Sequence, residues 1–179
     1  MSRVILDGQA TQRTLRRLAS QMVESVEPGA RLALVGVRRG GVPLAERLAD
    51  LIEEMVGERP DLGAIDITLY RDDLYTGLEK PSFGATELPF LLDGACIVLV
   101  DDVLFTGRTV LAALGVLRDY GRPRWVKLAV LVDRGWRELP LQADFVGKTI
   151  ETARGDKVLV EPDASDGKGR VSVTRESDR

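Results

Sequence analysis

Three short segments of the sequence are almost entirely apolar, with Lys127 as the one charged residue, and they restrict the possible folds more than any other feature. They are residues 32–37, 96–100 and 126–132. A strand with one face in water alternates polar and apolar residues, whereas a strand covered on both faces is apolar throughout. Segments with the spacing of amphipathic helices separate these strands. The alternation predicts an α/β fold with a twisted, mainly parallel sheet flanked by helices.

The helical segments show one apolar face each. In the first, Leu15, Leu18 and Met22 recur three and four residues apart, so they fall on the same side of a helix. Asp7 precedes this segment and is a suitable N-cap, because its side chain can accept a hydrogen bond from a free amide of the first turn. The predicted helices cover residues 10–26, 43–56 and 110–120.

The remaining segments have weaker strand signals. Residues 65–70 alternate as a half-buried strand should. Residues 71–94 have no clear period, and such a long connector favours a flexible functional loop, with a disordered insertion as the alternative. A chain of 179 residues suits one domain, so residues 1–179 are expected to form a single unit. Short strands are expected at 144–146, 157–160 and 171–173.

The composition excludes several kinds of chemistry. The chain has no histidine and one cysteine, Cys96, which rules out Ser-His-Asp triads, Cys-His pairs and Cys/His zinc sites. Carboxylates, arginines, hydroxyls, backbone amides and Mg²⁺ remain, and they suit phosphate chemistry. A net charge of −3 argues against a uniformly basic surface but allows a local basic patch. No apolar run approaches the ~20 residues of a membrane helix. Without a signal peptide or a membrane partner, the chain is expected to be cytoplasmic.

The segment after the second apolar strand carries the most specific chemistry. Asp101 and Asp102 end the strand, and the Thr-Gly-Arg-Thr run at 106–109 begins a helix. Free amides and the helix dipole at such a turn bind phosphate, and Gly107 lets the backbone approach closely. Carboxylates accept hydrogen bonds from a sugar diol or bind Mg²⁺. The order predicts a ribose 5-phosphate site; the alternative is a capped strand followed by an ordinary turn.

Residues 97–110 resemble the phosphoribosyl diphosphate (PRPP) signature of type I phosphoribosyltransferases. Residues 4–7, 66–73 and 121–123 are similar to the PyrR family of bifunctional pyrimidine operon regulators and uracil phosphoribosyltransferases. The Asp-Arg-Gly-Trp-Arg-Glu-Leu-Pro run that starts at Asp133 carries the most specific likeness. This resemblance implies the type I phosphoribosyltransferase fold, with a flexible loop at about 71–94 and a small hood built from the N- and C-terminal segments.

The resemblance implies that uracil and PRPP react to give UMP and diphosphate, with Mg²⁺ as cofactor. Asp101 and Asp102 would hold the ribose hydroxyls and the Mg²⁺ that PRPP carries, and Arg71 in the flexible loop is the third expected catalytic residue. Purine-specific relatives typically have an Asp where this chain has Phe105, which disfavours a purine substrate. The implied PRPP and UMP contacts are Arg38, Arg39, Gly40, Gly41, Val103, Leu104, Phe105, Thr106, Gly107, Arg108, Thr109, Asp133 and Arg134.

The same family binds the leader mRNA of pyrimidine operons, with UMP enhancing the binding, and forms homodimers or larger homo-oligomers. A row of arginines beside an aromatic residue suits phosphate contact and base stacking. The alternative is a solvated helix face. Two other functions stay open: a salvage phosphoribosyltransferase without an RNA role, and a PRPP-site protein that acts on another base. The candidate RNA contacts are Arg13, Arg16, Arg17, Trp136, Arg137 and Lys148.

Overall fold

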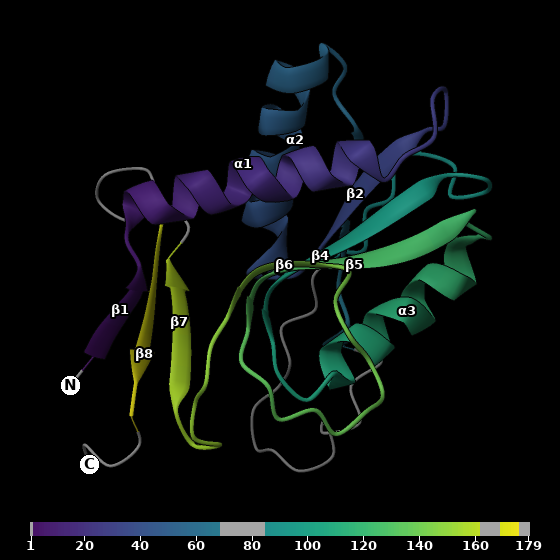
Figure 1. The fold of residues 1–179 in the computed structure, drawn as a ribbon. Helices are drawn as coiled ribbons and strands as arrows, with labels where there is room; N and C mark the ends of the chain where they lie inside the picture. Colours follow the sequence, from purple (N-terminus) through teal and green to yellow (C-terminus); the bar gives the residue numbers. More distant parts are fainter. Residues whose placement is uncertain (1, 69–84, 162–168, 176–179) are drawn as a thin grey trace.

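A computed structural model describes residues 2–68, 85–161 and 169–175 (Figure 1). Its main sheet has five parallel strands in the order β3-β2-β4-β5-β6. The three apolar segments form the central strands β2, β4 and β5, which confirms the predicted α/β architecture. The strands of this sheet are β2 (Leu32–Val37), β3 (Asp61–Ile65), β4 (Cys96–Leu104), β5 (Trp125–Asp133) and β6 (Phe145–Thr149).

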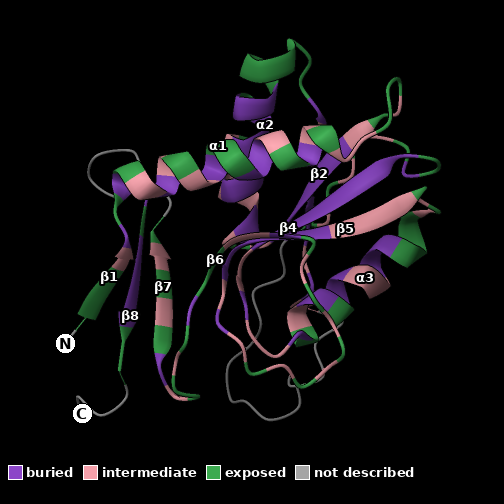
Figure 2. Ribbon diagram, in the orientation of Figure 1, coloured by how far each residue is buried: buried purple, intermediate pink, exposed green. Residues whose placement is uncertain are grey.

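Helices cover both faces of this sheet. Helices α1 (Gly8–Glu24) and α2 (Gly41–Val56) lie on one face, and α3 (Arg108–Tyr120) lies on the other (Figures 1 and 2). Val98 of β4 belongs to the core formed with α1 and α2, whereas its neighbour Leu99 belongs to the core formed with α3. This alternation explains why residues 96–100 of the strand are apolar at every position. No helix in the described part of the chain is long and apolar enough to cross a membrane.

A second, smaller sheet joins the two ends of the described chain. It is antiparallel, in the order β1-β8-β7. Leu6, Val171 and Val173 are buried in the same core as α1 and α2, so one face of this sheet packs onto the main body. The strands expected near its last two members are confirmed, and the first strand was not predicted. The bounds are β1 (Ser2–Leu6), β7 (Lys157–Glu161) and β8 (Arg170–Thr174).

The strand predicted at 65–70 is wrong in position, because β3 ends at Ile65. The strand pairs residue by residue with β2, from Asp61 opposite Ala33 to Ile65 opposite Val37, so the end of β2 sets its end. Residues 69–84 lie outside the described part of the chain, and they include most of the predicted loop at 71–94. Its described remainder contains one isolated antiparallel bridge, between Glu87 and Ala64.

Candidate active site

Two carboxylates lie near the end of β4. Asp101 is buried, with 7% of its surface exposed, and Asp102 is half-buried. The amide of Asp102 donates to Oδ1 of Asp101 at 3.0 Å, and the amide of Val103 donates to Oδ1 of Asp102 at 2.8 Å. Burial, followed by the neighbouring charge of Asp102, raises the pKa of Asp101 well above its usual value. The pair therefore has one acid inside the protein and one that is partly open.

The loop between β2 and α2 reaches this acidic pair. A β-carbon added to Gly40 would lie 2.2 Å from Oδ2 of Asp102, and one added to Gly41 would lie 2.1 Å from the carbonyl oxygen of Val100. Real side chains do not approach so closely, so a side chain at Gly40 would displace the Asp102 carboxylate and one at Gly41 would displace the backbone of β4. The peptide bond between Arg38 and Arg39 is cis. The structure thus brings together the two segments that the sequence assigned to diphosphate and ribose.

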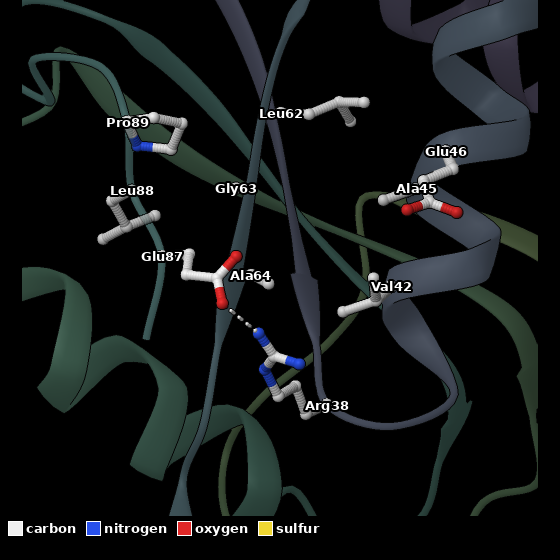
Figure 3. A pocket seen from close by; sticks show the side chains of 10 residues that line it. All are labelled: Arg38, Val42, Ala45, Glu46, Leu62, Gly63, Ala64, Glu87, Leu88 and Pro89. Atoms are coloured by element: carbon white, nitrogen blue, oxygen red, sulfur yellow. Dashed lines mark hydrogen bonds and ion pairs between the residues drawn. The ribbon is translucent and has the colours of Figure 1, made fainter. Parts of the chain in front are cut away.

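Arg38 points toward the segment that begins at Ala85. Its Nε donates to the carbonyl of Ala85 at 3.0 Å, and its Nη2 pairs with Oε1 of Glu87 at 3.0 Å. Arg38 and Glu87 line a hollow of about 620 Å³ between α2 and β3, whose apolar lining includes Val42 and Leu88 (Figure 3). Arg39 is exposed. The partnership with Glu87 was not visible in the sequence, because the two residues are 49 positions apart.

The Thr-Gly-Arg-Thr run forms a tight turn that enters α3. Gly107 has a φ of 92°, a left-handed conformation that glycine adopts without strain, and it is the N-cap residue of the helix. The amide of Arg108 donates to Oγ1 of Thr106 at 3.3 Å. Within the described residues the amides of Thr106, Gly107, Thr109 and Val110 have no acceptor from the protein. Such amides at a helix start bind anions.

The segment after β5 is tied to this turn. Asp133, the last residue of β5, accepts a hydrogen bond from the amide of Gly135 at 2.9 Å and forms an ion pair with Arg137. Arg137 also donates to the carbonyl of Phe105 at 2.7 Å. Its guanidinium therefore turns into the loop, with 21% of the side chain exposed. The sequence had placed Arg137 among surface residues, and the structure gives it internal partners.

Phe105 and Arg134 form a stacked pair beside the turn. The guanidinium carbon of Arg134 lies 4.1 Å from the centre of the Phe105 ring. Arg134 is buried, and it donates to the carbonyls of Asp156, Ala153 and Arg154 at 2.7, 2.9 and 3.1 Å. Burial lowers the pKa of Arg134. Its three carbonyl partners show that it fixes the turn at 153–156. The side chain of Leu104 lies in the core, which leaves only its backbone for a contact with ligand.

Glu138 is a site residue that the sequence interpretation missed. Its carboxylate pairs with Arg108 at 2.9 Å through one oxygen and with Arg154 through the other. Its amide, and that of Leu139, donate to the carbonyl of Thr106 at 2.9 and 3.3 Å. No local pattern reveals these contacts, since the partners are 30 and 16 residues away. Arg71 lies outside the described residues.

The candidate RNA contacts are only partly brought together. Arg17 donates to the carbonyl of Gly147 at 2.6 Å, which places α1 beside Lys148 on β6. Arg13 and Lys148 are exposed, and Arg16 forms an exposed ion pair with Glu54 at 3.4 Å. Trp136 is on the segment after β5, with 48% of its surface exposed and its indole donating to the carbonyl of Thr152 at 2.8 Å. No described contact joins it to the α1 row.

The donor set around the acids fits Mg²⁺ only if a ligand completes it. In residues 2–68, 85–161 and 169–175 no group of three or more His, Cys, Asp or Glu side chains could hold a metal ion. Asp101 and Asp102 supply carboxylate oxygens, and Mg²⁺ characteristically takes one or two carboxylates together with substrate phosphates and water. Buried Asp101 is poorly placed for direct coordination, so half-buried Asp102 is the better ligand.

Comparison with known proteins agrees with this geometry. Residues 2–163 match the family model for the phosphoribosyl transferase domain. The bifunctional protein PyrR of Pelotomaculum thermopropionicum is 49% identical over 169 residues, 94% of this chain and 93% of its own length. That of Corynebacterium efficiens is 51% identical over 177 residues, 96% of this chain and 92% of its own length.

Solved structures show the same fold at lower identity. The hypoxanthine phosphoribosyl transferase of Trypanosoma cruzi is similar over 98% of this chain and 92% of its own, with a TM-score of 0.71 and 17% identity. A hypoxanthine phosphoribosyltransferase of Staphylococcus aureus covers 84% of this chain and 79% of its own, with a TM-score of 0.67 and 19% identity. By its sequence relatives and its family match, the chain belongs to the phosphoribosyltransferase family and, within it, to the PyrR family of bifunctional proteins.

Proposed function

We propose that this chain transfers the phosphoribosyl group of PRPP to uracil, giving UMP and diphosphate, and that it regulates pyrimidine operons by binding leader mRNA when UMP is bound. The observation that carries the enzymatic part is the meeting of Gly40 with Asp102. It joins a glycine loop to an acidic pair at one edge of a parallel sheet, and the turn at 106–109 follows that pair in the chain. Ligands of such sheets bind at the carboxyl ends of the strands.

Each part of the site has a separate task in the proposed reaction. The turn at 106–109 holds the 5′-phosphate through its free amides, and Asp102 accepts hydrogen bonds from the ribose hydroxyls. The Gly40–Gly41 backbone lies beside the departing diphosphate, where its amides bind the charge that develops. Bond breaking at the anomeric carbon passes through an oxocarbenium-like state. Fixing both ends of the ribose therefore contributes more than a strong nucleophile.

The proposed cofactor is Mg²⁺ carried by PRPP. Half-buried Asp102 would be its carboxylate ligand, in preference to buried Asp101, and the ion would neutralise charge on the diphosphate. Asp101 is in a different environment from Asp102. Its carboxyl is buried and accepts a hydrogen bond from the amide of Asp102. We assign to Asp101 the support of the strand end and to Asp102 the contact with ligand.

The regulatory part of the proposal uses the basic residues of α1 and β6. Arg13, Arg16 and Lys148 are exposed, and the bond from Arg17 to Gly147 fixes the helix next to β6. Cations of this kind bind RNA phosphates, and the exposed indole of Trp136 can stack on an unpaired base. We also propose that the chain acts as one domain and as a homo-oligomer.

The test of the enzymatic part measures diphosphate release from PRPP and Mg²⁺ with uracil, hypoxanthine, guanine or orotate. We expect diphosphate release with uracil and none with the other three bases. Asp102→Asn should lower the rate roughly 100-fold or more while the protein stays folded, because a hydroxyl acceptor has lost its charge. Asp119→Asn, at the exposed end of α3, is the matched control and should keep the wild-type rate. Release with a purine, or an unchanged rate in Asp102→Asn, contradicts the proposal.

A further inference from the structure

The guanidinium of Arg137 makes several polar contacts inside the protein, which a purely solvent-exposed arginine would not have. Its guanidinium donates to the carbonyls of Phe105, Gly135 and Leu141 at 2.7, 3.2 and 3.2 Å, and it forms the ion pair with Asp133. A longer contact, 3.5 Å, reaches the carbonyl of Leu104. Arginine suits this position because its planar group offers five donors in fixed directions. The side chain thus links the end of β4 to the end of β5.

The hydrogen bond from Arg137 to the carbonyl of Phe105 also fixes the direction of the next amide. The peptide unit is planar and trans, so the C=O of one residue and the N–H of the next point in opposite directions. When the carbonyl of Phe105 points to Arg137, the N–H of Thr106 must point away from Arg137. The same holds one residue later, where the amides of Glu138 and Leu139 hold the carbonyl of Thr106 and so orient the N–H of Gly107.

These two N–H groups are among the amides that have no protein acceptor in the described residues. They are also the amides that the proposed function assigns to the 5′-phosphate. Their directions are therefore set from behind, by the segment that follows β5. Without Arg137, the Phe105–Thr106 peptide would lose its charged donor and could rotate.

We propose that Arg137 is a positioning residue for the phosphate-binding turn, acting through the peptide planes of Phe105 and Thr106. The inference rests on the proposed function for the identity of the ligand. It makes no use of contact between Arg137 and that ligand. A positioning role differs from a general stabilising role in one measurable way. Replacing Arg137 should weaken the binding of the phosphate end of the ligand and spare that of the nucleoside end.

The test compares the binding of UMP with that of uridine, which lacks the phosphate, by titration calorimetry of the full chain. Wild type should bind UMP more tightly than uridine. Arg137→Gln should weaken UMP binding by roughly tenfold to 100-fold and leave uridine binding within about twofold, since misplaced groups cost on this order. Arg137→Lys should be only slightly better than Arg137→Gln, because one ammonium cannot reach both Phe105 and Asp133 in the same way. Arg118→Gln, exposed on α3, is the matched control.

Kinetics gives a second measurement. In Arg137→Lys the KM for PRPP should rise with a smaller change in kcat, whereas Arg118→Gln should keep both. Equal losses of UMP and uridine affinity, or an unchanged preference for UMP in both Arg137 variants, would overturn the inference. If Arg137→Gln does not fold, Arg137→Lys decides alone. A wild-type protein that shows no preference for UMP would instead contradict the proposed function, so the two failures are distinguishable.

Discussion

Gly40 and Asp102 are 62 residues apart in the sequence, yet a β-carbon on the first would lie 2.2 Å from a carboxylate oxygen of the second. Parallel pairing explains the meeting, because β2 and β4 run side by side and their following segments leave at the same edge. The amide of Val103 holds the other oxygen of Asp102 at 2.8 Å, so the carboxylate cannot easily turn away. The contact joins two of the three parts of the proposed site.

Gly40→Ala tests this contact. Gly40 has an ordinary φ of −70°, so alanine brings no backbone strain, and only the clash with Asp102 matters. We expect a loss of stability of about 1–3 kcal/mol, as for other overpacked sites. Uracil-dependent turnover should fall by ~100-fold, because the acid and the loop must move apart. Thermal unfolding and diphosphate release measure the two effects.

The control for that variant is Gly29→Ala, where nothing lies within 4 Å of the added carbon. Gly29 has a φ of 78°, so its replacement should cost about 1 kcal/mol of stability and no activity. Equal activities of Gly40→Ala and wild type would show that the loop and the acid do not need this close approach.

Asp101→Asn tests whether the buried acid lowers the stability of the fold. Burial and the charge of Asp102 raise the pKa of Asp101 above the 3.8 of an unperturbed Asp, so the folded state keeps its proton to higher pH than the unfolded state. Above pH 3.8 the unfolded chain then binds fewer protons, and stability falls as the pH rises toward the folded pKa. Asparagine has no such titration and can still accept the bond from the amide of Asp102.

We therefore expect Asp101→Asn to be more stable than wild type at pH 7 by about 1–2 kcal/mol, roughly 2–8 °C in Tm. The gain should shrink as the pH is lowered to 4, where Asp101 is protonated in wild type. Unfolding curves without Mg²⁺ at several pH values measure this difference. A gain that is constant with pH, or a loss at pH 7, would show that Asp101 is not a destabilising buried charge.

The sequence predicts the scaffold well because its signals are local. Continuous apolar strands and the N-cap Asp7, which accepts from Ala10 at 2.8 Å, depend on neighbours within a few positions. The meeting of the acids with the glycine loop follows from parallel topology alone. The orientation of the arginines could not be predicted, because a cation at the end of a strand can face solvent or a distant carbonyl. Arg134 donates to carbonyls 19–22 residues away, and Arg137 donates to the carbonyl of Phe105, 32 residues away, which no local pattern specifies.

The RNA proposal is tested by reversing charge where no internal bond is lost. Arg13→Glu with Lys148→Glu should weaken binding of a pyrimidine operon leader hairpin about tenfold or more at low salt. The salt dependence should also become less steep, since fewer phosphates are neutralised. Arg17 is left in place because it holds β6 through Gly147. Arg118→Glu with Arg122→Glu, two exposed arginines at and just after the end of α3, changes the net charge by the same amount and is the control. Equal weakening by both double variants would remove α1 and β6 from the interface.

Gly107→Ala tests the turn itself. The φ of 92° strains any other residue, and the new carbon would lie 3.3 Å from Cδ1 of Leu141, the end of a side chain that can move. Stability should fall by about 1–2 kcal/mol, mostly from the backbone. Gly57→Ala is the matched control, because Gly57 has a φ of 76° in open space at the end of α2. Both variants should lose similar stability.

Only Gly107→Ala should raise the KM for PRPP, by about tenfold. The reason is that relaxing φ turns the amides that face the phosphate, whereas Gly57 is far along the chain from the turn. If the two variants have the same KM, the 5′-phosphate does not bind at this helix start.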